Sequence, residues 1–327
     1  MELKKGLMFL CLSIVLVLAA CSPGGASDKE FPSKNIEFIA PASPGGGYDA
    51  TSRAIQKILT DEKLVDQNIN VINKPGGNGE VGWKYLQNKD AHSLAINSSL
   101  IVTNNILGAS DLTFNDVTPL AILTTEWISY AVPLDSPYKD AQELMEQLKK
   151  DPSSIKIAIA PGLGNNDHLS FIEAAKTYGV DVTKLNFLVY EGGGDVVTAL
   201  LGGHVDFGVS SLSEFKDQHE AEKFRIVAVS SEERIKGLED VATWKEQGVD
   251  MVFPHWRGIV GPPDMTDEEI SFWDDTISKL VETDAWATLL ENNEWEPYYK
   301  NSKETMEFLE EQQGKYEVLI KDSGLID

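Results

Sequence analysis

Short apolar segments rich in Ile and Val alternate with amphipathic segments along the chain, a pattern typical of an α/β fold with largely parallel sheets. Strands are predicted at Ile36–Ala40, Asn70–Asn73, Leu94–Asn97, Ile155–Ala160, Asn186–Tyr190, Val205–Val209 and Arg225–Ser230. Helices are predicted at Asp49–Leu59, Glu80–Asn88, Ala141–Lys149, His168–Tyr178, Asp195–Leu201 and Glu214–Lys223. From Asp267 to Gly324 the pattern is almost entirely helical, and Pro297 interrupts it before a last helix at Lys303–Lys321.

Four predicted strand–loop–helix junctions are rich in glycine: IAPASPGGGYD, INKPGGNGE, IAPGLGNNDH and LVYEGGGD. Two precede residue 100 and two follow residue 150, and the long strand-like passage TPLAILTTEWISYAVPLDSPYKD separates them. This distribution predicts two similar lobes joined by crossing segments, with the hinge near Val132–Pro133 and Pro254–His255. One lobe would comprise residues 31–132 plus 254–327, and the other would comprise residues 133–253.

These glycine loops are suited to holding an anion. Glycine tolerates positive φ and lets a ligand approach the backbone closely. A loop before a helix leaves N–H groups without helical partners, and the helix dipole attracts negative charge to them. Four such loops converging on one place would form an anion-binding cleft from neutral amides. Taken singly, each loop is equally well explained as a tight strand-to-helix turn.

Nucleotide binding and common enzyme chemistries find no support in the motifs. No loop contains the Gly-Lys-Ser/Thr of a Walker loop. Gly77–Gly82 fits G-x-G-x-x-G, but Ala91–Ser110 lacks the acidic residue that would hold a dinucleotide ribose. The five histidines show no zinc-ligand spacing, and no G-x-S-x-G hydrolase elbow is present. We therefore expect no enzyme, no cofactor and no metal site.

The N-terminus predicts an exported, lipid-anchored protein. MELKK is followed by a short apolar run and by Leu-Ala-Ala-Cys, so residues 1–20 resemble a lipoprotein signal peptide and Cys21 its lipidation site. Residues 21–30, rich in Gly, Ser and Pro, would form a flexible tether. The alternative is an ordinary secretory signal or an uncleaved anchor with Cys21 incidental. Because Cys11 and Cys21 are the only cysteines, the folded part has no disulfide and no thiol nucleophile.

The formal net charge of −24 makes nucleic acid and anionic lipid surfaces poor partners. It does not exclude an anionic ligand, because a local site can oppose the overall field. Asp and Glu are so numerous, 52 in all, that an acid–base pair can be neither selected nor excluded.

Five segments, in this order, resemble the solute receptors of the tripartite tricarboxylate transporters, the TctC-like or Bug group. They are FPSKNIEFIAPASPGGGYDATSRAI, VINKPGGNGEVGWKYL, GLGNNDHLS, VYEGGGDVVTALLGGHVDFGVSSLSE and HWRGIVGPPDM. The resemblance covers the chain from about Phe31 to Ile326. It implies a two-lobed periplasmic-binding-protein fold, type II-like, in which crossing segments act as a hinge and the C-terminal region is helical.

The resemblance also implies a ligand site in which loop amides bind a carboxylate. It maps onto Gly45, Gly46, Gly47, Tyr48 and Asp49 in the first lobe, and onto Gly162, Gly164, Asn165, Asn166 and His168 in the second. Ser210-Ser211 stands where many members of the group carry an Asp, which favours an acidic or polar distal end of the ligand and weakens the case for an amino-group anchor.

Further candidates follow from position in the predicted elements. Ser98 and Ser99 follow a strand, where hydroxyls commonly face the crevice, although turn chemistry explains them equally well. Arg257 is the best charged anchor for a second carboxylate, with a stacked structural Arg as the alternative. Asp49 forms an i,i+4 pair with Arg53 and is either ligand support or a first-turn carboxylate, while His168 is expected to brace its loop. Ser43 and Gly193, from two of the glycine loops, complete the predicted ligand-binding set.

These features together predict a receptor at the extracytoplasmic face of the cell membrane, held by lipid at Cys21. It would capture a small organic polycarboxylate such as citrate and deliver it to a permease with a large and a small integral membrane subunit. We expect a monomer that binds no nucleic acid. A receptor of the same fold that reports a solute to a membrane signalling protein is the alternative, and a secreted hydrolase is disfavoured.

Overall fold

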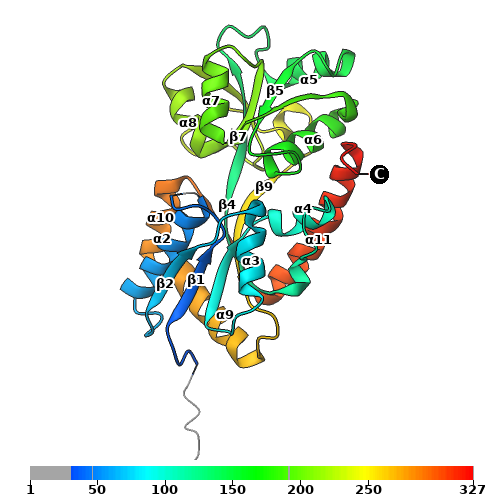
Figure 1. The fold of residues 1–327 in the computed structure, drawn as a ribbon. Helices are drawn as coiled ribbons and strands as arrows, with labels where there is room; N and C mark the ends of the chain where they lie inside the picture. Colours follow the sequence, from blue (N-terminus) through cyan, green and yellow to red (C-terminus); the bar gives the residue numbers. More distant parts are fainter. Residues whose placement is uncertain (1–30, 46, 191, 327) are drawn as a thin grey trace, which may run out of the picture. The chain divides into compact units, whose positions relative to one another are not determined.

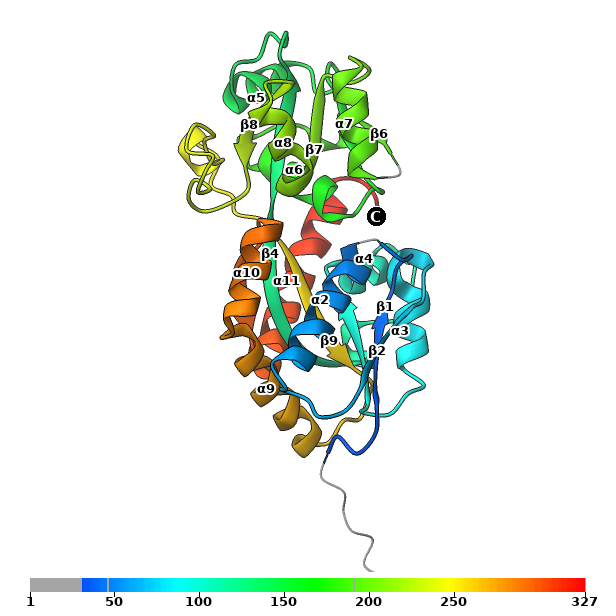
Figure 2. The same cartoon turned by 90° about the vertical axis from the view of Figure 1, so that its left-hand side faces the viewer.

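The computed structural model describes residues 31–45, 47–190 and 192–326. The chain divides into two units, Met1–Ser33 and Lys34–Asp327, and the fold described here is that of the second unit (Figures 1 and 2). The predicted signal peptide, Cys21 and the tether up to residue 30 lie outside the described residues, and so does Gly46 of the first glycine loop.

The described strands form one twisted sheet in the order β2-β1-β3-β9-β4-β7-β5-β6, with β8 and β10 also paired to β4. Their bounds are β1 Ile36–Ala40, β2 Ile69–Asn73, β3 Ser93–Asn97, β4 Thr118–Pro133, β5 Lys156–Ile159, β6 Asn186–Val189, β7 Phe207–Ser211, β8 Phe224–Val229, β9 Pro254–Gly261 and β10 Glu296–Lys300. The outer strands pair in parallel and the strands beside β4 pair antiparallel. The seven strands predicted from the sequence are confirmed, with ends that differ by no more than two residues.

Strand β4 belongs to both halves of this sheet. Its residues up to Trp127 pair with β9 and β10, and its residues from Ile128 onward pair with β7 and β8. We call β1, β2, β3, β9 and β10 the first strand group, and β5, β6, β7 and β8 the second. The change of partner at Trp127–Ile128 lies earlier than Val132–Pro133, where we expected the first crossing. Residues 119–132 are all buried, including the polar Thr124, Thr125 and Glu126, so no alternation of buried and exposed positions marks the change. The lobe boundaries themselves stay a prediction.

Helices cover both faces of the sheet (Figures 1 and 2). Their bounds are α2 Gly47–Asp61, α3 Glu80–Leu86, α4 Leu100–Ile106, α5 Ala141–Lys150, α6 Asn166–Tyr178, α7 Gly193–Leu201, α8 Leu212–Glu220, α9 Asp267–Val281, α10 Asp284–Asn293 and α11 Ser302–Asp322. Short 3₁₀ turns lie at Gly77–Gly79, Phe114–Asp116, Val182–Lys184 and Lys245–Gln247. Each predicted helix is confirmed, but α4 was not foreseen, because LIVTNNI is short and has no clear amphipathic period.

The C-terminal region is helical as predicted, apart from β10. Pro297 does not merely interrupt the helical pattern: it lies in β10, which pairs antiparallel with the outer side of β4. A proline is tolerated on such an edge strand because its missing N–H need not face a neighbour. Capping boxes begin α9 at Thr266 and α11 at Asn301.

The last helix, α11, connects parts of the fold that are far apart in sequence. It packs on β4 and α4 and also on α6, which belongs to the second strand group (Figure 1). Lys315 Nζ lies 2.8 Å from Glu173 Oε2, and Lys176 pairs with Asp322 near the C-terminus. Within the described ranges, no helix is both long and apolar enough to span a membrane.

Candidate functional site

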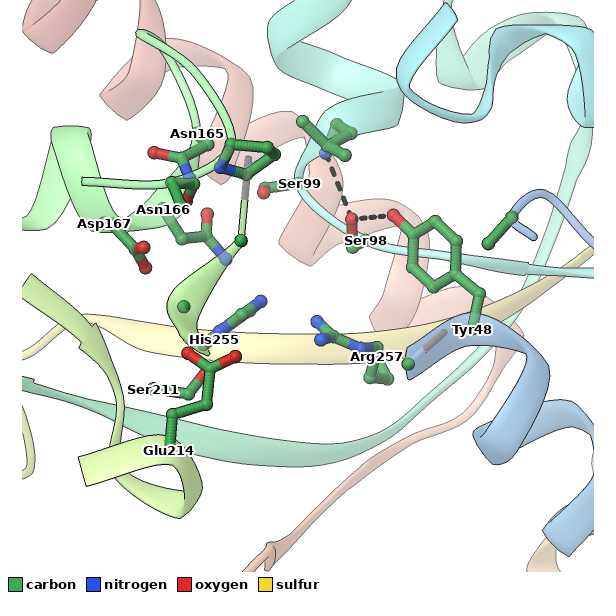
Figure 3. Close-up of a pocket in the computed structure, with 17 residues that line it drawn as sticks. Tyr48, Ser98, Ser99, Asn165, Asn166, Asp167, Ser211, Glu214, His255 and Arg257 are labelled. Carbon is green, nitrogen blue, oxygen red and sulfur yellow. Dashed lines mark hydrogen bonds between the residues drawn. The ribbon is translucent and has the colours of Figure 1, made fainter. Parts of the chain in front are cut away.

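A pocket of about 340 Å³ lies where the two strand groups meet (Figure 3). The first strand group and its loops contribute Ala42, Gly47, Tyr48, Ser98, Ser99, Leu100, His255 and Arg257; the second contributes Ala160, Pro161, Asn165, Asn166, Asp167, Gly192, Gly193, Ser211 and Glu214. The lining loops follow the carboxyl ends of β1, β3, β5, β6 and β7. This edge is where ligands bind in open α/β sheets, because the loops there open into a crevice.

The structure brings nine predicted site residues to this pocket: Gly47, Tyr48, Ser98, Ser99, Asn165, Asn166, Gly193, Ser211 and Arg257. Seven others do not line it: Ser43, Gly45, Asp49, Gly162, Gly164, His168 and Ser210. Gly46 lies outside the described residues. Ligand contact by any of these residues stays a prediction, and the following contacts show what several of them do instead.

Asp49 supports the first glycine loop through hydrogen bonds. Its carboxylate accepts the Gly45 N–H at 2.8 Å, Arg53 Nε at 3.0 Å and Asn73 Nδ2 at 2.8 Å. Asn73 Nδ2 also donates to the carbonyl of Ala42 at 3.0 Å. The Asn73 amide therefore links Asp49 to the backbone of the first glycine loop. The Arg53 and Gly45 hydrogen bonds lower the pKa of Asp49 to about 2, which keeps this buried carboxylate charged. Asp49 is therefore a positioning residue.

Tyr48 and Ser98 place two hydroxyl groups on one side of the pocket. Tyr48 Oη is hydrogen-bonded to Ser98 Oγ, which also accepts the Leu100 N–H at 3.3 Å (Figure 3). Burial raises the pKa of the Tyr48 phenol, and the nearby Arg257 charge opposes that rise. The Arg257 guanidinium lies 5.6 Å from the centre of the Tyr48 ring, within the range of a cation–π contact.

The third glycine loop, IAPGLGNNDH before α6, is braced by its own side chains. Asn165 caps α6 by accepting the His168 N–H at 2.9 Å, and its amide donates to the carbonyl of Ala160. His168 Nδ1 accepts the Gly164 N–H at 3.1 Å, so this ring braces the loop. Gly164 has a φ of +83°, and a Cβ there would lie 2.4 Å from Leu107 Cδ1. The positive φ favours glycine at this position, and an added Cβ would also require the Leu107 side chain to move.

Burial lowers the pKa of His168 to about 4, which predicts a pH effect on stability. The pKa of a histidine in the unfolded chain is about 6.5. Because the folded pKa of His168 is lower, the neutral ring makes its full contribution to the free energy of unfolding above about pH 6.5. This contribution is lost as the pH falls toward 4. The variant His168→Asn keeps an acceptor near the position of Nδ1 but does not titrate. We expect wild type to lose up to about 3 kcal/mol relative to this variant between those two pH values.

Denaturant unfolding of wild type and His168→Asn at a series of pH values measures this difference. Buried carboxyls such as Glu173, whose pKa is raised by burial, titrate in both proteins and cancel in the comparison. Parallel stability curves for the two proteins would contradict the assignment of a neutral, bracing His168.

Three polar side chains of the pocket have atoms without a protein partner. Asn166 is 3% exposed, and neither its Oδ1 nor its Nδ2 has a hydrogen-bond partner in the described part of the chain. Arg257 Nε and His255 Nδ1 are also buried atoms without a hydrogen-bond partner in the described part of the chain. The Arg257 Nη1 donates only to the adjacent Trp256 carbonyl at 3.3 Å. Buried polar atoms normally have partners, so such atoms lining a pocket indicate where a polar ligand binds.

Asp167, Glu214 and His255 also line the pocket, although they were not among the predicted site residues. Asp167 is 6% exposed, and burial together with the Glu214 charge raises its pKa well above the usual range. Glu214 accepts a hydrogen bond from Ser210 Oγ, so Ser210 supports this pocket carboxylate without lining the pocket itself. The only signal for Asp167 was its place beside Asn165 and Asn166 in a glycine loop.

Residues 52–325 match the family described as Tripartite tricarboxylate transporter family receptor. A UPF0065 protein from the gbd 5′ region of Cupriavidus necator is 26% identical over 311 residues, which cover 94% of this chain and 92% of that protein. The structure of a TctC solute binding protein from Polaromonas has a TM-score of 0.76 and 27% identity, covering 89% of this chain and 99% of that one. The structure of R. palustris Rpa4515 with adipate has a TM-score of 0.75 at 21% identity, covering 90% and 99%.

The structural comparisons confirm the predicted α/β periplasmic-binding-protein fold. The family match extends from the second turn of α2 to just past the end of α11, so it includes most of the pocket. The chain therefore belongs to the tripartite tricarboxylate transporter family receptors, a family of extracytoplasmic solute-binding proteins.

Proposed function

We propose that this receptor captures a small organic carboxylate, with citrate-like acids as the first candidates, and delivers it to the permease of a tripartite tricarboxylate transporter. One observation carries the proposal: a single pocket joins Arg257 and the Tyr48–Ser98 pair to the glycine loop at Asn165 and Asn166. These groups supply hydrogen-bond donors from both strand groups. A similar fold with adipate is consistent with such a ligand.

Capture would proceed by closure of one lobe on the other. β4 pairs with both strand groups, and β9 begins beside the residue at which β4 changes partner, so the connection between them is short. A ligand that contacts both groups binds the closed state better and shifts the population toward it. We assign residues 31–132 plus 254–327 to one lobe and residues 133–253 to the other, and we place the hinge on β4 between its change of partner at Trp127–Ile128 and the expected crossing at Val132–Pro133, beside Pro254–His255.

A thermal-shift screen of the chain from Ser22 onward, followed by calorimetric titration, tests the ligand class. The panel should contain citrate, simple dicarboxylates, amino-carboxylates and aromatic acids, with sugars and neutral amides as controls. A ligand at 100 times its dissociation constant adds about 2.7 kcal/mol of stability. We expect at least one carboxylate to bind and none of the neutral compounds. Binding of a neutral compound with no response to any carboxylate would overturn the proposed function.

Delivery to a permease is tested by uptake of the identified ligand in cells that lack this receptor. We expect uptake to fall to background and to return when the gene is restored. Unchanged uptake together with loss of a transcriptional response would instead identify a sensor that acts through a membrane signalling protein.

We also propose that Cys21 carries the lipid that holds the receptor at the extracytoplasmic membrane face. Cys21→Ser is expected to abolish incorporation of a labelled fatty acid, because the thiol that accepts the diacylglyceryl group is absent. The folded residues from Lys34 onward should be unaffected. Metabolic labelling and membrane fractionation measure the change, with Cys11→Ser as the matched control that keeps its label. Continued labelling of the Cys21 variant would show that another group carries the lipid.

A further inference from the structure

The charges that line the pocket are unbalanced in a way that a plain dicarboxylate does not explain. Asp167 and Glu214 line it together with one described cationic side chain, Arg257. Figure 3 shows Arg257 and Tyr48 on one side and Asp167 and Glu214 on the other, with His255 between them. His255 does not add a cation, because burial and the Arg257 charge lower its pKa well below the usual range.

The acidic side is held in place by the fold. The Glu214 carboxylate accepts a hydrogen bond from the Ser210 hydroxyl. A Cβ at Gly193 would lie 1.7 Å from Glu214 Oε2. The absence of a side chain at Gly193 therefore makes room for this carboxylate. Asp167, in the first turn of α6, is buried at the pocket wall instead of being solvated at a helix end. Glu126, held by Ser213, lies in the adjoining hollow of about 420 Å³ that shares Glu214 and Arg257 with the pocket.

Asn166 gives an independent indication of a ligand at the acidic side. This side chain is 3% exposed, and neither polar atom of its amide has a partner in the described part of the chain. It lies beside Asp167, and Figure 3 shows its amide directed into the pocket. An amide oxygen next to two carboxyl groups is a good acceptor set for an N–H donor that carries positive charge.

We infer that the carboxylate ligand of this receptor also carries a protonated nitrogen, and that Asp167, Glu214 and the amide of Asn166 receive it. Arg257 and the Tyr48–Ser98 side would hold the carboxylate at the opposite end. This inference rests on the proposed function and narrows its substrate class to amino-carboxylates. It replaces the sequence expectation of an acidic or polar distal end, which relied on Ser210-Ser211 standing in place of an Asp.

The competing arrangement has a protonated Asp167 that donates to a second carboxylate. Burial and the charges of Glu214 and Glu126 raise the pKa of Asp167, while a hydrogen bond from the Ala160 backbone and the Arg257 charge oppose the rise. An ammonium group would require Asp167 to ionise on binding, so affinity should increase as the pH rises toward and through the raised pKa of Asp167. A second carboxylate would require the protonated form, so its affinity should decrease over the same range.

Matched probes decide between the two. Adipate and 5-aminopentanoate differ by exchange of one carboxylate for an ammonium group; glutarate with 4-aminobutanoate and succinate with 3-aminopropanoate repeat the comparison at shorter lengths. The α-amino acids glutamate and aspartate complete the panel. By calorimetry we expect the best amino-carboxylate to bind at least about tenfold more tightly than its matched dicarboxylate, with affinity that increases with pH. If dicarboxylates bind more tightly at every length, the inference fails and the proposed function stands. If no carboxylate binds, both fail.

Variants test the assigned residues. Asp167→Asn and Glu214→Gln should each weaken the amino-carboxylate by about tenfold or more, and should leave a dicarboxylate unchanged or bound more tightly. Gly193→Ala should act like Glu214→Gln, because the added Cβ displaces the carboxylate. Asp195→Asn is the matched control: Asp195 is an exposed first-turn carboxylate of α7 that does not line the pocket, and we expect wild-type affinity. Equal losses for both ligand classes in correctly folded variants would contradict the assignment.

Discussion

Replacing Arg257 with Gln is expected to lower the affinity for the best carboxylate ligand by about 100-fold, with little change in melting temperature. Arg257 projects from β9 into the pocket, its Nε has no protein partner, and it forms no ion pair within the described residues. Its charge is therefore available for a ligand, and the loss of a charge-assisted hydrogen bond should appear mainly as a faster dissociation rate.

Arg234→Gln provides a matched control for this experiment. Arg234 is exposed, and its Nε lies 2.9 Å from Glu246 in a surface ion pair outside the pocket. The same substitution there should leave affinity unchanged. Calorimetric titration and melting curves of wild type and both variants give the result. Wild-type affinity in a folded Arg257→Gln protein would show that this guanidinium has a structural role. That result would support the alternative stated in the sequence analysis, a stacked structural Arg.

Replacing Asp49 with Ala is expected to destabilise the protein by about 2–3 kcal/mol, because a buried carboxylate that accepts several charge-assisted hydrogen bonds is removed. Gly45 N–H and Asn73 Nδ2 then lose their acceptor, so the first glycine loop loses its support and ligand affinity should also fall. Asp61→Ala, in the same helix, is the control. Asp61 pairs with Lys57 at an exposed i,i+4 position, and such pairs contribute well under about 1 kcal/mol.

The pH dependence provides a second measurement of the same role. The folded pKa of Asp49 is about 2, below the ordinary carboxyl value, so its contribution is fully present above about pH 4 and is lost as pH falls through about 2. The stability of wild type should therefore decline more steeply than that of Asp49→Ala over this window. Equal stabilities and parallel acid curves for Asp49→Ala and Asp61→Ala would contradict the role of Asp49 as a loop support.

The sequence determined the local elements and the chemistry of the loops. Apolar periodicity identified the strands and most helices, because hydrophobic spacing reports which face of an element is buried. Glycine before a helix predicted anion-binding loops, and that role stays a prediction; three of the four loops reach the pocket, whereas INKPGGNGE does not line it. The five family-like segments placed Tyr48, Asn165 and Arg257 in one functional set. All three line the same pocket. These successes depend on short-range physics, in which a residue and its near neighbours carry the signal.

The tertiary structure decided which of the 52 acidic residues face the pocket. It also decided where along β4 the pairing changes from the first strand group to the second. Asp167 and Glu214 begin different helices after different strands, and only the sheet order β7-β5 brings those helix ends together. Alternation of buried and exposed positions does not mark the β4 crossing, because all residues from 119 to 132 are buried whichever partner strand they pair with. Burial of a carboxyl and the closeness of a second charge are properties of the folded surroundings, and one-dimensional spacing does not encode them.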